Sequence, residues 1–284
     1  MPTFTIRSMT RDEMDDALQW AADEGWNPGI YDADPFHAAD PDGFLVGMLG
    51  DEKIAQISAV QYGQDFGFIG FFIVKPEYRG QGYGRRIWEA AMARLAGRNI
   101  GLDGVPAQQE NYRKSGFSYA HRSIRYQGNG GGPMPPMAQC TAIVSMPDLS
   151  LDEVIAYDRG FFPQERREFL KKWMTMPYST VLGIRTGDRL AGFGVLRKCR
   201  DGHKIGPLFA DTPPLAETLF MVMLAQAREN EPVFIDVPET SPAAIDLVQR
   251  FGLNPVFETA RMYTKAVPGL SLARTYGITT FELG

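Results

Sequence analysis

The chain has 284 residues, of which 44% are hydrophobic and 22% charged, and its formal net charge is -5. This composition is typical of a globular protein with one large domain or two ordinary ones. The negative charge argues against nucleic acid as the main partner, because binding to phosphate backbones needs a surplus of lysine and arginine.

The first half of the chain alternates helical and strand patterns. Apolar residues at helical spacing predict helices around residues 14–21 and 87–95. Runs rich in β-branched and aromatic residues predict strands at 43–48, 54–62, 66–74 and 100–102. A helical turn around Tyr112 and a last strand from Phe117 complete this half.

Residues 128–136 read Gly-Asn-Gly-Gly-Gly-Pro-Met-Pro-Pro and interrupt the pattern. Glycine removes backbone restraint and proline removes hydrogen-bond donors, so neither a helix nor a strand ladder is expected to continue here. We therefore predict a linker at 129–136 between a first domain, 1–128, and a second domain, 137–284.

The second half repeats the plan of the first at an offset of 136 residues. Residues 47–55 align with 183–191, and 115–117 align with 251–253. Two matches in the same order at one spacing predict a duplicated unit.

A glycine-rich loop joins a predicted strand to a predicted helix in the first half. Unpaired N–H groups at a helix N-terminus bind anions, and glycine lets the backbone approach phosphate oxygens closely. The spacing matches neither the dinucleotide motif Gly-x-Gly-x-x-Gly nor a triphosphate loop ending in Gly-Lys-Ser/Thr. The predicted phosphate-binding residues are Arg79, Gly80, Gln81, Gly82, Tyr83, Gly84 and Arg85.

The loop fits Arg-x-x-Gly-x-Gly, and residues 112–117 fit Tyr-x-x-x-Gly-Phe. Both motifs resemble the acetyl-CoA signature of the GNAT (GCN5-related) N-acetyltransferases. The resemblance implies an α/β (α+β) fold of two tandem domains, each a mixed, mostly antiparallel twisted sheet flanked by helices. It also implies acetyl-CoA as co-substrate, with its pyrophosphate on the loop and its pantetheine arm paired to the backbone of Phe72, Ile73 and Val74.

The same resemblance implies that Tyr112 lies beside the sulfur and protonates the departing CoA thiolate. The attacking amine must also lose a proton, and many GNAT enzymes use a carboxylate on or near the splayed strand. Residues 68–74 contain no acid. Glu24, Asp32 and Asp103 are the candidates for the base, and the sequence does not choose among them.

In the second half, the positions that match the glycine loop are 211–220, which contain two prolines and neither glycine nor arginine. Val248 takes the place of Tyr112. We therefore predict a degenerate GNAT-like accessory domain without a second CoA site. Residues 204–210, 235–238 and 261–263 resemble the accessory domain of a tandem-GNAT subgroup.

Four residues are candidates for contact with the acceptor. Trp26, Asn27 and Asp32 follow the first helix, in a loop that lines the acceptor cleft of this fold. Asp236 ends a buried type of strand, where a carboxylate must face a cleft or be paired, for example with Arg261. We expect the acceptor to be a small primary amine, such as an amino acid, polyamine or aminoglycoside. A peptide or protein lysine, or an acyl-CoA-binding regulatory protein without turnover, is the alternative.

The remaining sequence features argue for a reduced, metal-free protein. Cys140, Cys199 and the three histidines show no metal or disulfide spacing. Residues 1–24 lack the pattern of a signal peptide, and no apolar run approaches the ~20 residues of a membrane helix. We expect a cytoplasmic monomer or homodimer that uses neither membrane nor metal.

Overall fold

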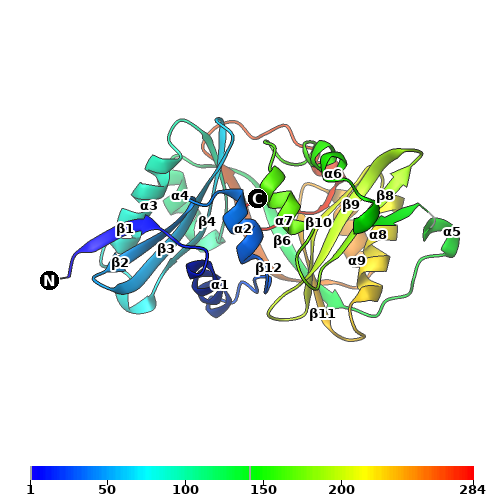
Figure 1. Ribbon diagram of the computed structural model, residues 1–284, viewed down its shortest axis with the longest axis horizontal. Helices are drawn as coiled ribbons and strands as arrows, with labels where there is room; N and C mark the ends of the chain where they lie inside the picture. The colour runs from blue at the N-terminus through cyan, green and yellow to red at the C-terminus, as the bar shows by residue number, and fades with distance from the viewer. Residues whose placement is uncertain (1, 141) are drawn as a thin grey trace.

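The computed structural model describes residues 2–140 and 142–284, which form one continuous sheet of 13 strands flanked by helices (Figure 1). The first half contains β1 (Phe4–Ser8), α1 (Glu13–Asp23), α2 (Ala33–Ala39), β2 (Phe44–Leu49), β3 (Glu52–Tyr62), β4 (Phe66–Val74), α3 (Tyr83–Arg94), β5 (Asn99–Gly104), α4 (Gln109–Lys114) and β6 (Ser118–Asn129). The second half contains α5 (Met137–Cys140), β7 (Ile143–Ser145), α6 (Leu151–Asp158), α7 (Arg167–Trp173), β8 (Thr180–Thr186), β9 (Arg189–Lys198), β10 (His203–Ala210), α8 (Pro213–Gln226), β11 (Pro232–Pro238), α9 (Pro242–Arg250), β12 (Asn254–Tyr263) and β13 (Thr275–Gly277).

The duplicated plan is confirmed. The β2–β3 hairpin corresponds to β8–β9, β4 to β10, and β6 to β12, each close to the predicted offset. The predicted first helix is α1, whose apolar stripe at Met14, Ala17, Leu18 and Ala21 is buried. Local periodicity was therefore sufficient to locate these elements.

The two halves exchange their last strands. The strand order is β1-β2-β3-β4-β5-β12-β6-β11-β10-β9-β8-β7, so β12 lies between β5 and β6, while β6 pairs with β11. The ladder of β6 continues through Gly128 and Asn129, which pair with Val233 and Pro232. Gly128 and Asn129 therefore belong to β6, and the glycine-rich break begins one residue later than the predicted linker.

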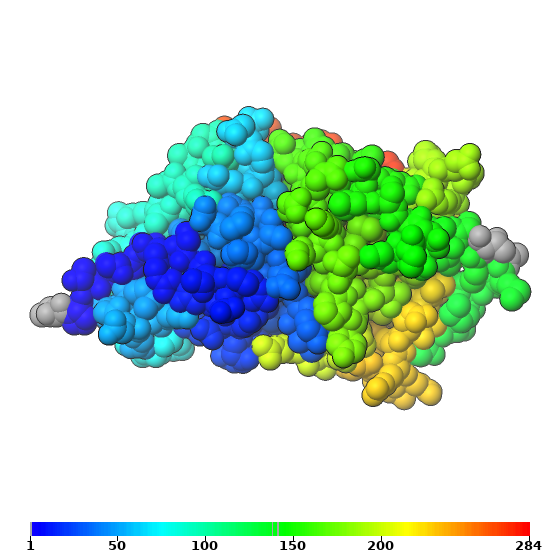
Figure 2. All heavy atoms as spheres, viewed as in Figure 1, coloured from blue at the N-terminus to red at the C-terminus, as the bar shows by residue number. Residues whose placement is uncertain are grey.

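Among the described residues, three apolar cores pack against the sheet. One is shared by both halves and packs α1, α2, α6 and α7 on the sheet, with Phe36 against Trp173 at 6.1 Å between ring centroids. The others lie under α3 in the first half and under α8 and α9 in the second. The halves meet along a continuous seam in the view of Figure 2. The shared core makes the junction part of the folded interior.

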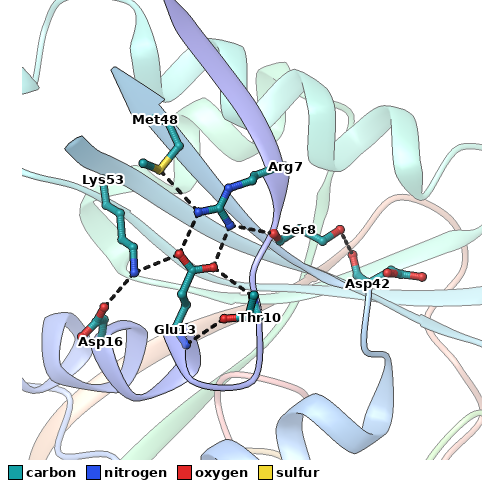
Figure 3. Close-up of polar contacts among 8 residues, drawn as sticks. All are labelled: Arg7, Ser8, Thr10, Glu13, Asp16, Asp42, Met48 and Lys53. Atoms are coloured by element: carbon teal, nitrogen blue, oxygen red, sulfur yellow. Dashed lines mark hydrogen bonds and ion pairs between the residues drawn. The ribbon is translucent and has the colours of Figure 1, made fainter. Parts of the chain in front are cut away.

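The start of α1 is fixed by a charged cluster at the N-terminal edge (Figure 3). The Glu13 carboxylate accepts hydrogen bonds from Arg7 at 2.7 and 2.8 Å and from the Thr10 amide at 2.9 Å. The Glu13 amide in turn donates to Thr10 Oγ1 at 3.4 Å, a reciprocal arrangement that caps the helix. Lys53 on β3 joins Glu13 at 2.9 Å, so the cluster ties α1 to the sheet.

The segment after β12 returns to the middle of the molecule. β13 pairs with β10, and the chain then runs between the halves, where the C label lies in Figure 1. Tyr62 on β3 donates its hydroxyl hydrogen to the Leu283 carbonyl at 3.2 Å. The tail, residues 278–284, is buried along this path except for a few atoms that face a cavity.

Candidate active site

The site begins where two neighbouring strands separate. β4 and β5 pair in parallel only from Phe66 to Ile69, and Ile69 opposite Leu102 is the last pair. Just beyond, the β3–β4 register shifts, and Phe71 adopts a left-handed φ of 50°. A bulge of this kind bends a strand and ends its pairing. The β4 edge after Ile69 is therefore free of β5.

A cavity of about 610 Å³ opens at this separation. Its walls come from β4, β5, the glycine loop, α3, α4, β12 and the tail. The lining residues are Glu24, Trp26, Ile69, Gly70, Phe71, Phe72, Ile73, Val74, Arg79, Gly80, Gly84, Arg85, Trp88, Leu102, Asp103, Gly104, Val105, Gln108, Asn111, Tyr112, Phe257, Thr259, Phe281 and Glu282. The splayed-strand residues Phe72, Ile73 and Val74 thus meet the predicted loop and Tyr112 in one space.

The glycine loop presents a set of unused donors. Gly80 and Gly82 have φ values of 75° and 88°, and a Cβ at either would meet no atom within 4 Å outside the adjoining residues. Among the described residues, the N–H groups of 80–85 donate to no backbone carbonyl, and α3 starts at Tyr83. Donors at a helix N-terminus form a site for an anion.

The charged and polar side chains of the loop have different roles. Arg79 donates to the Val74 carbonyl at 2.8 Å and pairs with Glu24, which ties the loop to β4 and to the end of α1. Gln81 donates to the Glu77 carbonyl at 2.8 Å. Arg85 is largely exposed beside Glu89, where it adds positive charge at the cavity mouth.

Tyr112 lies on α4 with its ring packed inside the wall. The ring is 5.6 Å from that of Trp88 and contacts the backbone of Gly104, where a Cβ would approach to 2.2 Å. Burial raises the pKa of Tyr112 to about 12. The hydroxyl is therefore protonated at neutral pH and able to donate.

Asp103 lines the cavity but is held by an arginine. Arg261, its cross-strand neighbour on β12, donates to its two oxygens at 3.0 and 2.6 Å, and Thr259 donates at 3.3 Å. Burial raises the pKa of Asp103, and the charge of Arg261 opposes that rise. Glu24 is likewise paired, with Arg79. Two of the three candidate bases, Asp103 and Glu24, therefore already have cationic partners.

The loop after α1 reaches the cavity through Glu24 and Trp26. Trp26 lines it, whereas Asn27 turns to the second half and exchanges hydrogen bonds with the backbone of Asp201, each 2.9 Å long. Asp32 is buried and pairs with Arg197 at 3.1 Å. The structure thus places Asn27 and Asp32 at the junction of the halves, outside the cavity wall, because arginine and backbone donors of the second half hold them there.

Asp236 also lies in this junction. Arg125, opposite it on β6, donates to both of its oxygens at 2.6 and 2.8 Å. Although burial acts to raise it, the pKa of Asp236 is lowered by the Arg125 guanidinium. The sequence analysis named Arg261 as an example of a partner for Asp236. Because β12 pairs with β5 and β6 pairs with β11, Arg261 instead lies opposite Asp103, and Arg125 lies opposite Asp236. Asp236 does not line the cavity.

Phe257, Phe281 and Glu282 are among the lining residues that the sequence prediction missed. Phe257 on β12 and Phe281 in the tail form an aromatic wall with ring centroids 6.1 Å apart, and Glu282 follows in the same tail. The tail has no counterpart in the first half, so neither motif spacing nor the repeat pointed to it. The only sequence signal for the tail was Phe281 next to Glu282, an apolar and an acidic residue in a segment without helical or strand periodicity.

The equivalent space of the second half is filled by the chain itself. β10 and β11 pair only from His203 to Ile205, and β13 then lies against β10 beyond that point. The Ile278 amide donates to the Asp236 carbonyl at 2.9 Å, and α8 opens with Pro213. This slot therefore offers neither a free strand edge nor a glycine loop.

Within residues 2–140 and 142–284, no three His, Cys, Asp or Glu side chains are placed to hold a metal ion. No helix of this described part is long and apolar enough to cross a membrane.

Comparison with known proteins agrees with both halves of this architecture. Residues 9–117 match the acetyltransferase (GNAT) family, and residues 154–276 match an acetyltransferase (GNAT) domain. A holothin acyltransferase from Pseudoalteromonas sp. (strain SANK 73390) is 31% identical over 284 residues, covering 99% of this chain and 95% of the relative. An uncharacterized N-acetyltransferase, YitH, from Bacillus subtilis (strain 168) is 21% identical and covers 76% of each chain.

Solved structures share the fold. A putative acetyltransferase from Pyrococcus horikoshii superposes with a TM-score of 0.83 at 22% identity, covering 99% of this chain and 96% of the other. A tandem GNAT protein from the clavulanic acid biosynthesis pathway gives a TM-score of 0.63 at 15% identity, covering 94% and 99%. The chain belongs to the GNAT family of acetyltransferases, with two GNAT domains in tandem.

Proposed function

We propose that this protein transfers the acetyl group of acetyl-CoA to a small primary amine by direct attack. The observation that carries the proposal is a single cavity that joins the free edge of β4, the donors of residues 80–85 and Tyr112. An extended thiol arm can pair with a free strand edge as another strand would. The pyrophosphate would then lie on the loop, and the thioester would lie beside Tyr112.

The reaction needs two proton transfers. The amine nitrogen bonds to the thioester carbonyl carbon, the carbon–sulfur bond breaks, and the nitrogen gives up a proton. The departing thiolate takes the hydroxyl proton of Tyr112, which solvent then replaces. The raised pKa of Tyr112, about 12 because of burial, keeps that proton available at neutral pH.

The cavity walls support a compact acceptor. Trp26, Phe257 and Phe281 supply aromatic surface to the cavity walls. Such walls favour a primary amine with an apolar or planar body over a polyamine or an aminoglycoside, whose many polar groups would lose water without replacement. The relative named as an acyltransferase supports acyl transfer as the reaction class.

An acyl-CoA-binding protein without turnover is the second candidate. It is favoured by the pairing of Glu24 with Arg79 and of Asp103 with Arg261, which leaves neither carboxylate free to accept a proton.

One assay separates the two functions. Acetyl-CoA is incubated with the protein and, in turn, benzylamine, phenethylamine, an amino acid, spermidine, an aminoglycoside and a lysine peptide. We expect thiol release that depends on an amine, matched one-to-one by acetylated amine in mass spectrometry. Tight binding of acetyl-CoA with no thiol release from any acceptor would exclude the transferase and leave the binding protein.

A further inference from the structure

We propose that Glu282, carried into the first half by the tail of the second, binds the ammonium group of the acceptor and takes its proton. This inference rests on the proposed acyl transfer and supplies the base that Glu24 and Asp103 do not. The accessory half would then complete the active site of the catalytic half.

The tail runs directly against the splayed strand. The Glu282 carbonyl oxygen lies 2.2 Å from where a Cβ on Gly70 would stand, so only glycine allows this approach. Gly70 is the first residue of β4 beyond its pairing with β5. Thr280 Oγ1 accepts the amides of Glu282 and Leu283 at 3.1 and 2.9 Å, which fixes the turn that presents the side chain. Glu282 therefore lines the cavity beside the strand edge at which the thioester arm is expected.

The Glu282 carboxylate has an unused oxygen. The residue is only 4% exposed, yet its Oε2 has no hydrogen-bond partner among the described residues. A buried polar atom without a partner is rare in folded proteins and costs free energy. By contrast, the carboxylates of Glu24 and Asp103 in the same cavity each have an arginine partner. Because Glu282 lines the cavity, we expect an ammonium group bound there to satisfy this oxygen.

Two buried arginines lie near Glu282. Burial acts to lower the pKa values of Arg125 and Arg197, but neighbouring anions, Glu282 among them, raise the pKa of each. Neither arginine makes a hydrogen bond to Glu282: Arg125 is bound to Asp236 and the Trp26 carbonyl, and Arg197 to Asp32. The Glu282 carboxylate therefore has no hydrogen-bonded arginine, unlike Asp236 and Asp32.

The proton balance is complete with these two residues. The ammonium group of the acceptor passes one proton to Glu282 and becomes a neutral amine, which attacks the thioester carbon. The nitrogen loses a second proton to solvent as the amide forms, and Tyr112 protonates the thiolate. The products are the amide and CoA, and the proton on Glu282 returns to solvent.

The test uses Glu282→Gln in the full chain, with Glu168→Gln as a control because Glu168 is exposed on α7 and lies outside the cavity. Thermal unfolding and acetyl-CoA affinity report whether the fold and the loop are intact. Calorimetry then measures benzylamine, phenethylamine and tyramine binding to the CoA-saturated protein. We expect Glu282→Gln to bind acetyl-CoA within twofold of the unmodified protein but at least one of these amines at least tenfold more weakly, and to lose at least 100-fold in kcat/KM for it.

The outcomes separate this proposal from acyl transfer itself. If Glu282→Gln binds the amines as the unmodified protein does, or if the unmodified protein binds none of them, the proposal is wrong. If amine binding depends on Glu282 but no thiol is ever released, the amine-binding role of Glu282 is supported and the proposed acetyl transfer is wrong. If Glu282→Gln does not fold, Glu282→Asp keeps the charge and shortens the side chain; a raised KM for the amine with unchanged acetyl-CoA affinity is then expected, and an unchanged KM overturns the proposal.

Discussion

The hydroxyl of Tyr112 is the group on which the chemical step depends most. Tyr112→Phe keeps the ring packed against Trp88 but removes the proton donor. We expect kcat to fall roughly 100-fold, within the range for loss of a general acid, while acetyl-CoA affinity changes little. Because the pKa of Tyr112 is raised to about 12 by burial, the unmodified enzyme should show no alkaline loss from this group up to about pH 9.

Tyr119→Phe is the matched control for that measurement, because Tyr119 is exposed and donates to Glu239 away from the cavity. The kcat values of Tyr112→Phe and Tyr119→Phe, measured by steady-state kinetics, test whether Tyr112 is the proton donor. Equal rates for the two would remove Tyr112 from the mechanism.

The Arg125–Asp236 pair has a structural role that the strand exchange explains. Asp236→Ala leaves the Arg125 guanidinium buried without its main counter-ion, and such a loss costs about 3–5 kcal/mol in free energy of unfolding. The control is Glu217→Ala, which breaks the exposed pair with Arg250 and should cost no more than about 1 kcal/mol. Chemical denaturation measures both. Similar small losses would show that the junction does not depend on this ion pair.

Among the elements, the glycine loop and α3 carry the anion site. Gly82→Asp places a carboxylate where the pyrophosphate is expected, so acetyl-CoA affinity should fall at least 100-fold by charge repulsion. Gly97→Asp is matched to it: Gly97 follows α3, has a φ of 85° and is open to solvent like Gly82 at 88°. Both variants carry similar backbone strain, but only the first lies at the loop. Equal affinities in calorimetry would contradict the assignment of the loop.

The connection between β1 and α1 makes a separate contribution to stability, and one that depends on pH. The hydrogen bonds from Arg7 lower the pKa of Glu13 in the folded state below its usual range. A carboxyl whose pKa is lowered by folding stabilises the protein above its unfolded pKa of about 4.3, and that contribution is lost as the pH falls. Because Arg7 is half-exposed, the effect is expected to be about 1 kcal/mol.

Glu13→Gln should therefore melt at a lower temperature than the unmodified protein at pH 7, and the difference should shrink towards pH 3. Melting curves across this range are the measurement. A difference that does not change with pH would mean that the charge of Glu13 does not contribute.

At the scale of the whole molecule, the sequence predicted where helices and strands lie better than it predicted which strands pair in the sheet. β2, β3 and β4 were located because their patterns are local, and the loop and Tyr112 were located because their motifs are short. The positions of β6 and β12 were not predictable, because equivalent strands of a duplicated chain fit equally well beside β5. Glu282 could not be found from the sequence because its role depends on where the tail crosses the junction.

The duplication also explains why the molecule should have one cofactor site. Both halves have a strand that separates from its parallel neighbour, but β13 occupies the separation in the second half. The second half also has Pro213 at the start of α8, in place of the glycines that precede α3. The first half has an open cavity and the second half has a filled slot. We therefore predict that each chain binds one molecule of acetyl-CoA.

Calorimetric titration of the full chain with acetyl-CoA tests this account most directly. We predict one molecule of acetyl-CoA bound per chain, and no binding in the same range of concentrations by Gly82→Asp. A stoichiometry of two, or one binding event that Gly82→Asp leaves unchanged, would contradict the placement of the site in the first half.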